Sequence, residues 1–245
     1  SNSMPQQTDN NGIFIEGMTD PTELRRFLQI KFLQEEIQSA YDILLKGVRA
    51  QSRENSEPPL RALWDFLDQS FSKKSEHLKC GQGCAFCCHT GVTATQLEWD
   101  GILTAAQKKG IDLNAVMARS SKSIDRIRQA MRLEKKLKQT DWHQLVMNQP
   151  CPFLDDQRSC IVYEDRPLDC RMVVAFRGEC ESKNLEHAQR GVWLEEAVAP
   201  TVIARFQHER TPKIKRRKFD GTQPVKLLQA WLIAWQDKKS KKRKN

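Results

Sequence analysis

The chain has 245 residues, of which 39% are hydrophobic and 29% are charged, as in an ordinary soluble globular protein. Its longest nearly apolar stretches, such as residues 225–235, are far too short and interrupted to span a bilayer, which argues against a membrane protein. The formal net charge of +9 is unevenly spread, because the chain from Arg210 onward holds 13 Lys or Arg against two Asp or Glu.

One domain with two appended ends is predicted. The residues before Met4 are typical of the remnant of a cleaved tag, and residues 1–18 are predicted to be disordered. Residues 19–209 are predicted to form a helical cysteine-cluster domain. Residues 210–245 are predicted to form a basic linker, a helix and a disordered tail. Because no basic-then-apolar leader opens the chain, we expect a cytoplasmic protein.

Two amphipathic helices are expected before the first cysteine. Residues 19–48 begin with a helix-start signal, because Asp20 can cap, Pro21 suits the first helical position and Glu23 completes a capping box. Apolar residues then recur at helical spacing up to Val48. After a polar break, a second helix is indicated by the apolar positions Leu60, Leu63, Trp64, Leu67 and Phe71.

A first group of four cysteines lies within nine residues of "CGQGCAFCCH". Gly81 and Gly83 permit a tight turn, and thiolates two or three residues apart can converge on one centre in such a turn. The adjacent pair Cys87 and Cys88 is harder to place at one centre, so either they serve different metals or one is not a ligand. His89 could replace one sulfur. The four candidate ligands are Cys80, Cys84, Cys87 and Cys88.

Helices are also expected between the two cysteine groups. Thr95 and Glu98 stand at capping-box spacing, and Gly110 can end the helix that they begin. A long helical pattern follows from about Leu113 to Leu137, with a short one over residues 141–147.

A second group of four cysteines lies in the irregular stretch from residue 150 to 182. The polar turn "DDQRS" suggests a small hairpin within residues 151–163. A loop so long and so poor in apolar periodicity usually has something else holding it, and thiolates bound to a metal would do so. The candidate ligands are Cys151, Cys160, Cys170 and Cys180.

The spacing alone allows two cofactors. Tetrahedral zinc takes four Cys, or Cys with His, whereas an iron–sulfur cluster takes closely spaced thiolates with a remote fourth. The pattern from Cys80 to Cys87 also resembles the cluster loop of radical S-adenosylmethionine enzymes. Their barrel of alternating strands and helices does not suit this strand-poor chain, but a 4Fe-4S cluster stays an alternative to zinc. Disulfides are disfavoured in a reducing compartment, and thiols that only hold a loop together are the plainer alternative.

The two composite motifs carry a family resemblance. "CGQGCAFCCHTGVTATQLE", followed by "CPFLDDQRSCIVYEDRPLDCR", resembles the family of zinc- or iron-chelating cysteine-cluster proteins, the CxxCxxCC domain, over residues 80–180. In this chain three residues separate Cys80 from Cys84, whereas the family's name has two residues between its first two cysteines. The resemblance implies metal binding by all the cysteines named above, with Cys180 in the least distinctive surroundings. Its other matching positions are Tyr163, Arg166, Pro167 and Arg171.

Arg166 and Arg171 flank Cys170, and two roles are open for them. Their N–H groups could offset the negative charge of a thiolate centre by contacting the sulfurs. They could instead form surface ion pairs with neighbouring acids, and the candidates are Glu164, Asp165 and Asp169.

One branch of the family resembles bacterial flagellin lysine methylases, which would imply an enzyme that modifies a protein substrate. An S-adenosylmethionine pocket would favour a glycine-rich turn between a clear strand and a helix. The sequence itself shows no such turn. Whether the chain is an enzyme is left open.

The basic C-terminal region suggests a second kind of partner. Residues 213–218 and 238–244 could bind nucleic acid or another acidic partner by releasing counterions. Trp231 and Trp235 are expected to form an apolar helix face rather than a base-stacking platform. With helices also expected over residues 191–210 and 223–245, the predicted fold is mainly α, its helices framing an irregular cysteine-rich metal-binding region with little β structure.

Overall fold

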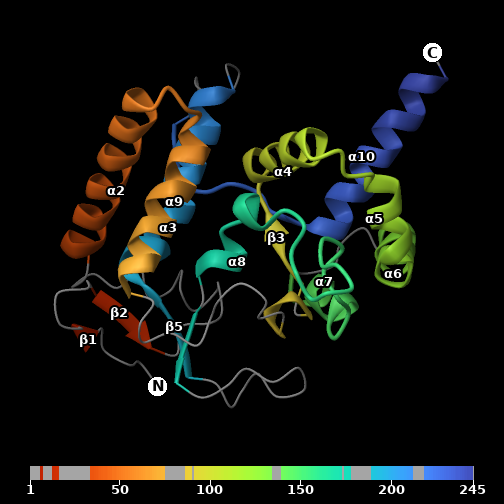
Figure 1. Ribbon diagram of the computed structural model, residues 1–245, viewed down its shortest axis with the longest axis horizontal. Helices are drawn as coiled ribbons and strands as arrows, with labels where there is room; N and C mark the ends of the chain where they lie inside the picture. The colour runs from red at the N-terminus through yellow and green to blue at the C-terminus, as the bar shows by residue number, and fades with distance from the viewer. Residues whose placement is uncertain are drawn as a thin grey trace. The chain divides into compact units, whose positions relative to one another are not determined.

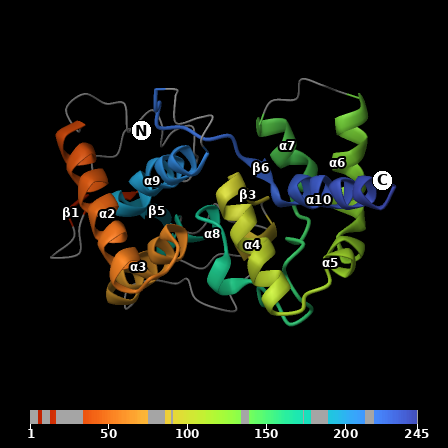
Figure 2. The same cartoon turned by 90° about the horizontal axis from the view of Figure 1, so that it is seen from above.

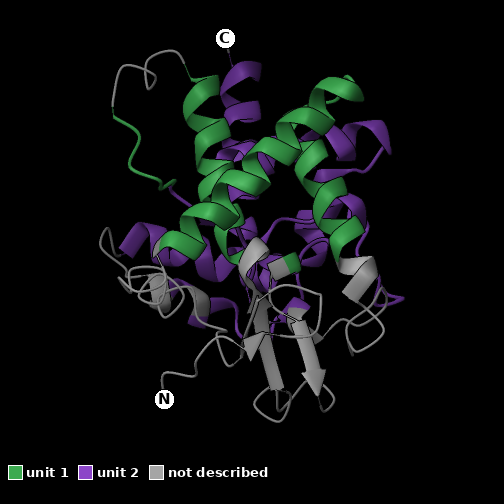
Figure 3. Cartoon of the chain, turned by 90° about the vertical axis from the view of Figure 1, so that its left-hand side faces the viewer, with its two compact units in different colours: residues 1–81, 171–180, 186–223 green, residues 82–170, 181–185, 224–245 purple. Residues whose placement is uncertain are grey.

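The computed structural model describes residues 6–7, 13–16, 34–74, 86–89, 91–133, 139–172, 174–177, 189–211 and 218–244 (Figure 1). The chain is mainly α, as the sequence predicts. It forms two compact units, each assembled from separate stretches of the chain (Figure 3). Unit 1 comprises residues 1–81, 171–180 and 186–223, and unit 2 comprises residues 82–170, 181–185 and 224–245.

Three helices form the helical part of unit 1: α2 (Gln34–Glu54), α3 (Pro59–Lys74) and α9 (Leu194–Arg210). They pack against one another in pairs (Figure 2). Gly47 on α2 allows a close approach, because a Cβ at this position would stand 3.0 Å from the Phe66 ring of α3. The buried side chains that these helices share include Leu44, Val48, Leu63, Trp64, Leu67, Val202 and Ile203.

A four-stranded antiparallel sheet completes unit 1. Its strand order is β1 (Gln6–Gln7), β2 (Ile13–Glu16), β5 (Gln189–Trp193) and β4 (Val174–Arg177). Two of these strands lie within the stretch expected to be disordered, and β5 takes residues 191–193, which were expected to be helical. Strand pairing joins residues far apart in sequence, so short runs such as "IFIE" give no local signal of it.

Unit 2 contains α4 (Gln96–Lys108), α5 (Leu113–Arg119), α6 (Ser121–Leu133), α7 (Gln139–Val146) and α10 (Leu228–Arg243). A short antiparallel pair, β3 (Thr93–Ala94) with β6 (Lys226–Leu227), joins the start of α4 to the start of α10. The Trp231 ring stacks on Trp99 with 6.2 Å between ring centroids, and its Nε1 donates to the Ala94 carbonyl at 2.8 Å. The expected core role of Trp231 is therefore confirmed.

Both predicted ends of α4 are confirmed. The Thr95 hydroxyl accepts from the Glu98 N–H, and the Glu98 carboxylate accepts from the Thr95 N–H, so the capping box is complete. At the other end Gly110 has φ +64°, and Ile111 N donates to the Ala106 carbonyl at 2.9 Å. The helices expected over Leu60–Phe71 and residues 141–147 are present as α3 and α7.

The long helix expected from Leu113 to Leu137 is divided in two. α5 ends at Arg119, and α6 begins at Ser121. The Ser120 carbonyl accepts from Ile124 N at 3.0 Å and from the Ser123 hydroxyl at 3.1 Å, so Ser120 begins a new helix. Serines favour helix starts because their side chains compete for backbone hydrogen bonds. Residues 134–138 lie outside the described residues.

Other helix bounds also differ from expectation. The start signals Asp20, Pro21 and Glu23 lie outside the described residues, and α2 continues past Val48 to Glu54. α10 runs to Arg243, through the lysines that were expected to form a disordered tail. No described helix combines the length and the apolar character that crossing a bilayer requires.

Candidate metal centre

Four of the eight candidate ligands lie among the described side chains. Cys88 belongs to the short 3-10 helix η3 (Phe86–His89). Cys151 and Cys160 lie in the irregular stretch after α7, and Cys170 lies in the short helix α8 (Asp169–Met172). All four side chains are half-buried. Cys80, Cys84 and Cys180 lie outside the described residues, and of Cys87 only the backbone is described.

Two backbone hydrogen bonds join the first cysteine group to the second. Cys151 N donates to the Cys88 carbonyl at 2.7 Å, and Asn148 N donates to the His89 carbonyl at 2.9 Å. The chain turns into this position at the end of α7, where Asn148 adopts φ 58°, a left-handed conformation that asparagine tolerates. Members of the two predicted groups are therefore neighbours in unit 2.

Residues 151–170, hereafter the second cysteine segment, contain the predicted hairpin. Leu154 and Cys160 form an antiparallel bridge, and Ile161 N donates to the Phe153 carbonyl at 2.9 Å. The Asp155 carboxylate closes the turn by accepting from the N–H groups of Gln157 and Ser159, both at 2.9 Å. The hairpin therefore places Cys160 beside Leu154, which lies on the arm that begins near Cys151.

Buried apolar side chains hold the second cysteine segment against unit 2. Phe153, Val162 and Leu168 are 1%, 2% and 5% exposed, and the Phe153 ring meets the Trp99 ring edge-on at 6.3 Å. Burying side chains of this size is worth about 1.5–3 kcal/mol each. Core contacts therefore help to hold this loop, and a metal bound by its thiolates, as expected from the sequence, would add to them.

Two carboxylates fasten the end of this segment to the chain around β3. Glu98, which is 4% exposed, uses Oε1 to accept from Thr95 N and Oγ1, both at 3.0 Å, and Oε2 to accept from Leu168 N at 2.7 Å. Asp169 Oδ2 accepts from Thr93 N at 2.9 Å and from its hydroxyl at 3.3 Å. Burial raises the pKa of Glu98 above its ordinary value, against the opposing effect of its hydrogen bonds.

The sequence identified Glu98 only as a capping residue and did not identify Asp169 as an anchor. A capping box is a local pattern, whereas the Leu168 contact joins residues 70 positions apart. The signal that could have found it is the position of Glu98 at the end of the "TGVTATQLE" motif that follows the first cysteine group.

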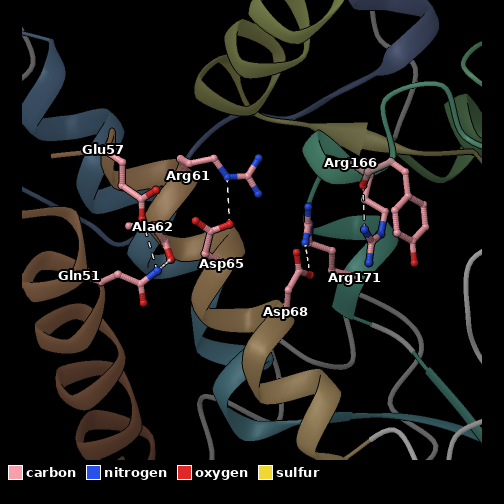
Figure 4. Close-up of polar contacts among 9 residues, drawn as sticks. Gln51, Glu57, Arg61, Ala62, Asp65, Asp68, Arg166 and Arg171 are labelled. Atoms are coloured by element: carbon pink, nitrogen blue, oxygen red, sulfur yellow. Dashed lines mark hydrogen bonds and ion pairs between the residues drawn. The ribbon is translucent and has the colours of Figure 1, made fainter. Parts of the chain in front are cut away.

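Arg171, which follows Cys170, is held by unit 1. Its Nη1 donates to Asp68 Oδ1 on α3 at 2.6 Å (Figure 4). Its guanidinium lies 4.4 Å from the Trp64 ring centroid. The Arg171 side chain is only 3% exposed, so this ion pair involves a desolvated cation. Asp68 was not among the acidic partners considered from the sequence.

Arg166 and Tyr163 contact each other in unit 2. Arg166 Nη1 donates to the Tyr163 carbonyl at 2.8 Å, and the guanidinium lies 4.0 Å from the centroid of the Tyr163 ring. Glu164, one of the considered partners, makes an ion pair at 3.1 Å with Lys109, the residue that follows α4. Tyr163 and Arg166 thus brace the short 3-10 helix η4 (Tyr163–Asp165) just before Cys170.

The described part of the chain does not by itself complete a metal site. Within it, no three His, Cys, Asp or Glu side chains gather closely enough to hold an ion. A complete set of ligands would therefore need sulfurs from the four cysteines whose side chains lie outside the described residues. The four described thiols suit such a set, since half-buried cysteines can bind a metal as thiolates.

Comparison with known proteins finds one family model that matches this region. Residues 79–191 match the sequence model of the CxxCxxCC family, described as "Putative zinc- or iron-chelating domain". No curated protein and no solved structure matches the chain. The match begins just before Cys80 and covers all eight cysteines, together with the motifs that meet at Cys88 and Cys151. Over residues 79–191 the chain is therefore similar to the CxxCxxCC family of zinc- or iron-chelating domains.

Proposed function

We propose that this protein holds zinc or an iron–sulfur cluster through its two groups of four cysteines, in a structural or redox role. The family match supports chelation of zinc or iron. The proposed ligands are Cys80, Cys84, Cys87, Cys88, Cys151, Cys160, Cys170 and Cys180.

The observation that carries the proposal is the contact between the two cysteine groups. Zinc–sulfur bonds are about 2.3 Å long, so thiolates that share an ion must come from backbone segments that lie side by side. The hydrogen bond from Cys151 N to the Cys88 carbonyl meets this requirement for segments that are distant in sequence. It favours centres that draw ligands from both groups over two separate local turns.

The donor set suits both metals. Thiolate sulfur is a soft ligand that both zinc and iron–sulfur clusters accept. Bound zinc would add folding free energy, whereas a cluster would supply one-electron transfer. Half-buried thiols next to a packed core limit access of water and oxidants, which suits either role.

The adjacent cysteines of η3 suggest how eight thiols could be shared. Neighbouring positions in a 3-10 helix are about a third of a turn apart around the helix axis. We therefore expect Cys87 and Cys88 to serve different metal ions or different corners of a cluster.

The test is metal analysis with a visible spectrum on the full chain purified anaerobically. If eight thiolates form two four-coordinate sites, about two zinc ions per chain are expected in a colourless protein; a cluster would give a brown protein with iron and acid-labile sulfide. Cys88→Ser and Cys151→Ser are expected to lower metal content, whereas the exposed hairpin variant Asp156→Asn is the matched control. Absence of both metals from the wild-type protein would overturn the proposal.

A second function, nucleic-acid binding, is favoured by the end of α10. The helix is buried from Leu228 to Ile233, but six exposed Lys and Arg residues follow between Lys238 and Lys244. If all six contacted phosphates of duplex DNA, binding would weaken with log salt concentration at a slope of about −5. Charge reversal at Lys238, Lys239, Lys241 and Lys242 is expected to abolish salt-sensitive binding of a DNA duplex, and unchanged binding would exclude this helix as its source.

A further inference from the structure

Glu98 is buried more deeply than helix capping explains. A capping box requires contacts between residues one turn apart, which an exposed side chain can make. Glu98 instead lies in the interior with 4% exposure, where a carboxylate is costly unless it is well hydrogen-bonded. Only one of its oxygens serves the cap at Thr95, and the other accepts from Leu168 N at 2.7 Å. This second contact needs its own explanation.

Leu168, whose N–H donates to Glu98, stands two positions before Cys170, a proposed metal ligand. Cys170 N donates to the Pro167 carbonyl at 3.0 Å, so the turn that holds Leu168 also holds Cys170. Asp169, between them, accepts two hydrogen bonds from Thr93. The backbone that leads to the Cys170 sulfur is thus fastened at two consecutive residues, Leu168 and Asp169.

The other hydrogen-bond partners of these two carboxylates lie close in sequence to the first cysteine group. Thr93 and Thr95 follow Cys88 and His89 closely in the chain, and Gly91 between them has φ 80°. The carboxylates therefore link the segment that carries Cys170 to the segment that follows Cys88. A link of this kind fixes ligands from both groups in one arrangement before a metal binds.

We infer that Glu98, assisted by Asp169, is a positioning residue for the metal centre, setting where Cys170 lies relative to Cys88. The inference rests on the proposed function, because it concerns the ligands of that centre. In this inference Glu98 acts through the Leu168 N–H, not as a metal ligand. Groups that orient metal ligands in this way typically change metal affinity by about 10- to 100-fold when they are removed.

The test is a Co²⁺ titration of the reduced, metal-free full chain, followed by thiolate-to-cobalt absorption. Glu98→Ala is expected to weaken Co²⁺ binding by about 10- to 100-fold and to lower the absorption per bound ion. Glu98→Gln, which keeps one acceptor oxygen, is expected to fall between this variant and the wild type. Glu164→Ala, which removes a glutamate whose side chain is 71% exposed, is the matched control and should match the wild type.

Thr95→Ala separates positioning from helix capping. It breaks the capping box but leaves the bond between Glu98 and Leu168, so the inference requires nearly wild-type Co²⁺ affinity. Equal losses in Thr95→Ala and Glu98→Ala would overturn the inference, because capping alone would then explain both. Wild-type affinity and absorption in Glu98→Ala would overturn it as well.

Two further readouts keep the test decisive. If circular dichroism shows that Glu98→Ala does not fold, Asp169→Ala, which removes a half-buried side chain, takes its place. A loss of Co²⁺ affinity in that variant supports the inference, and an unchanged affinity overturns it.

A wild-type protein that gives no thiolate-to-cobalt absorption would overturn the proposed function and this inference together. Wild-type binding that the variants leave unchanged would overturn the inference alone.

Discussion

Helix α4 and the second cysteine segment lie in the same unit but are stabilised in different ways. α4 is defined by signals within its own sequence, from the capping box at Thr95 to the left-handed Gly110. The cysteine segment has a hairpin and two short helical turns, and it is held by side chains that reach other parts of unit 2, such as Phe153. The structure of α4 is therefore set by local contacts, whereas the structure of the second cysteine segment depends on contacts with the core.

This difference changes what a metal is needed for. If core contacts hold the second cysteine segment, its thiols are arranged in advance and metal binding adds to an existing structure. Zinc fingers, by contrast, are unfolded without their metal. We therefore expect the metal-free, reduced protein to keep its helices and a cooperative unfolding transition.

The largest effect is expected from Phe153→Ala. Phe153 is 1% exposed and packs on Trp99, so its removal leaves a cavity that should cost about 3–5 kcal/mol of unfolding free energy. Urea unfolding of the metal-free protein, followed by tryptophan fluorescence, measures it. Leu133→Ala, at a position 73% exposed, is the control and should change stability by less than about 0.5 kcal/mol. A loss below about 1 kcal/mol in Phe153→Ala would mean that the core does not hold the segment.

An intermediate effect is expected from pH. Burial raises the pKa of Glu98 above 4.5, so the folded protein keeps a proton that the unfolded chain releases. This stabilisation is complete below 4.5 and is lost as pH rises through the raised pKa, at about 1.4 kcal/mol per pH unit at most. Glu98→Gln should flatten this part of the pH profile in urea unfolding of the metal-free protein. An unaltered profile would contradict the assignment to Glu98.

The smallest effect is expected from Gly110→Ala. Gly110 has φ +64°, where an alanine costs roughly 1 kcal/mol, and open space surrounds it, so the cost is purely conformational. Thermal unfolding measures the loss, with Lys109→Ala, at the exposed preceding position, as the control. Because the change is local to α4, metal affinity should stay at the wild-type value. A large fall in affinity would show that the two regions are not separable.

The difference between local contacts and contacts that join distant residues also decides what the sequence could predict. Thr95, Glu98 and Gly110 are local signals, and they predicted both ends of α4 correctly. Ser120 also acts locally, but the continuous apolar pattern around it predicted an unbroken helix. Pairing of β2 with β5 joins residues far apart in the sequence, such as Phe14 and Trp193, and no short pattern records such a contact.

The candidate site follows the same rule. The cysteine spacing marked the candidate ligands and two motifs, which the family match bears out for the region as a whole. The spacing could not show that Cys151 bonds to Cys88 through the backbone, or that Glu98 reaches Leu168, because both contacts depend on the folded chain. The partner of Arg171 was missed for the same reason, since Asp68 lies on a helix 103 positions earlier.

X-ray absorption at the edge of the bound metal tests the central claim most directly, because it counts sulfur neighbours in the full, anaerobically purified chain. We expect a first shell dominated by sulfur, at about 2.3 Å if the metal is zinc. A shell in which nitrogen and oxygen neighbours predominate would contradict the account, because the cysteines would then not be the ligands.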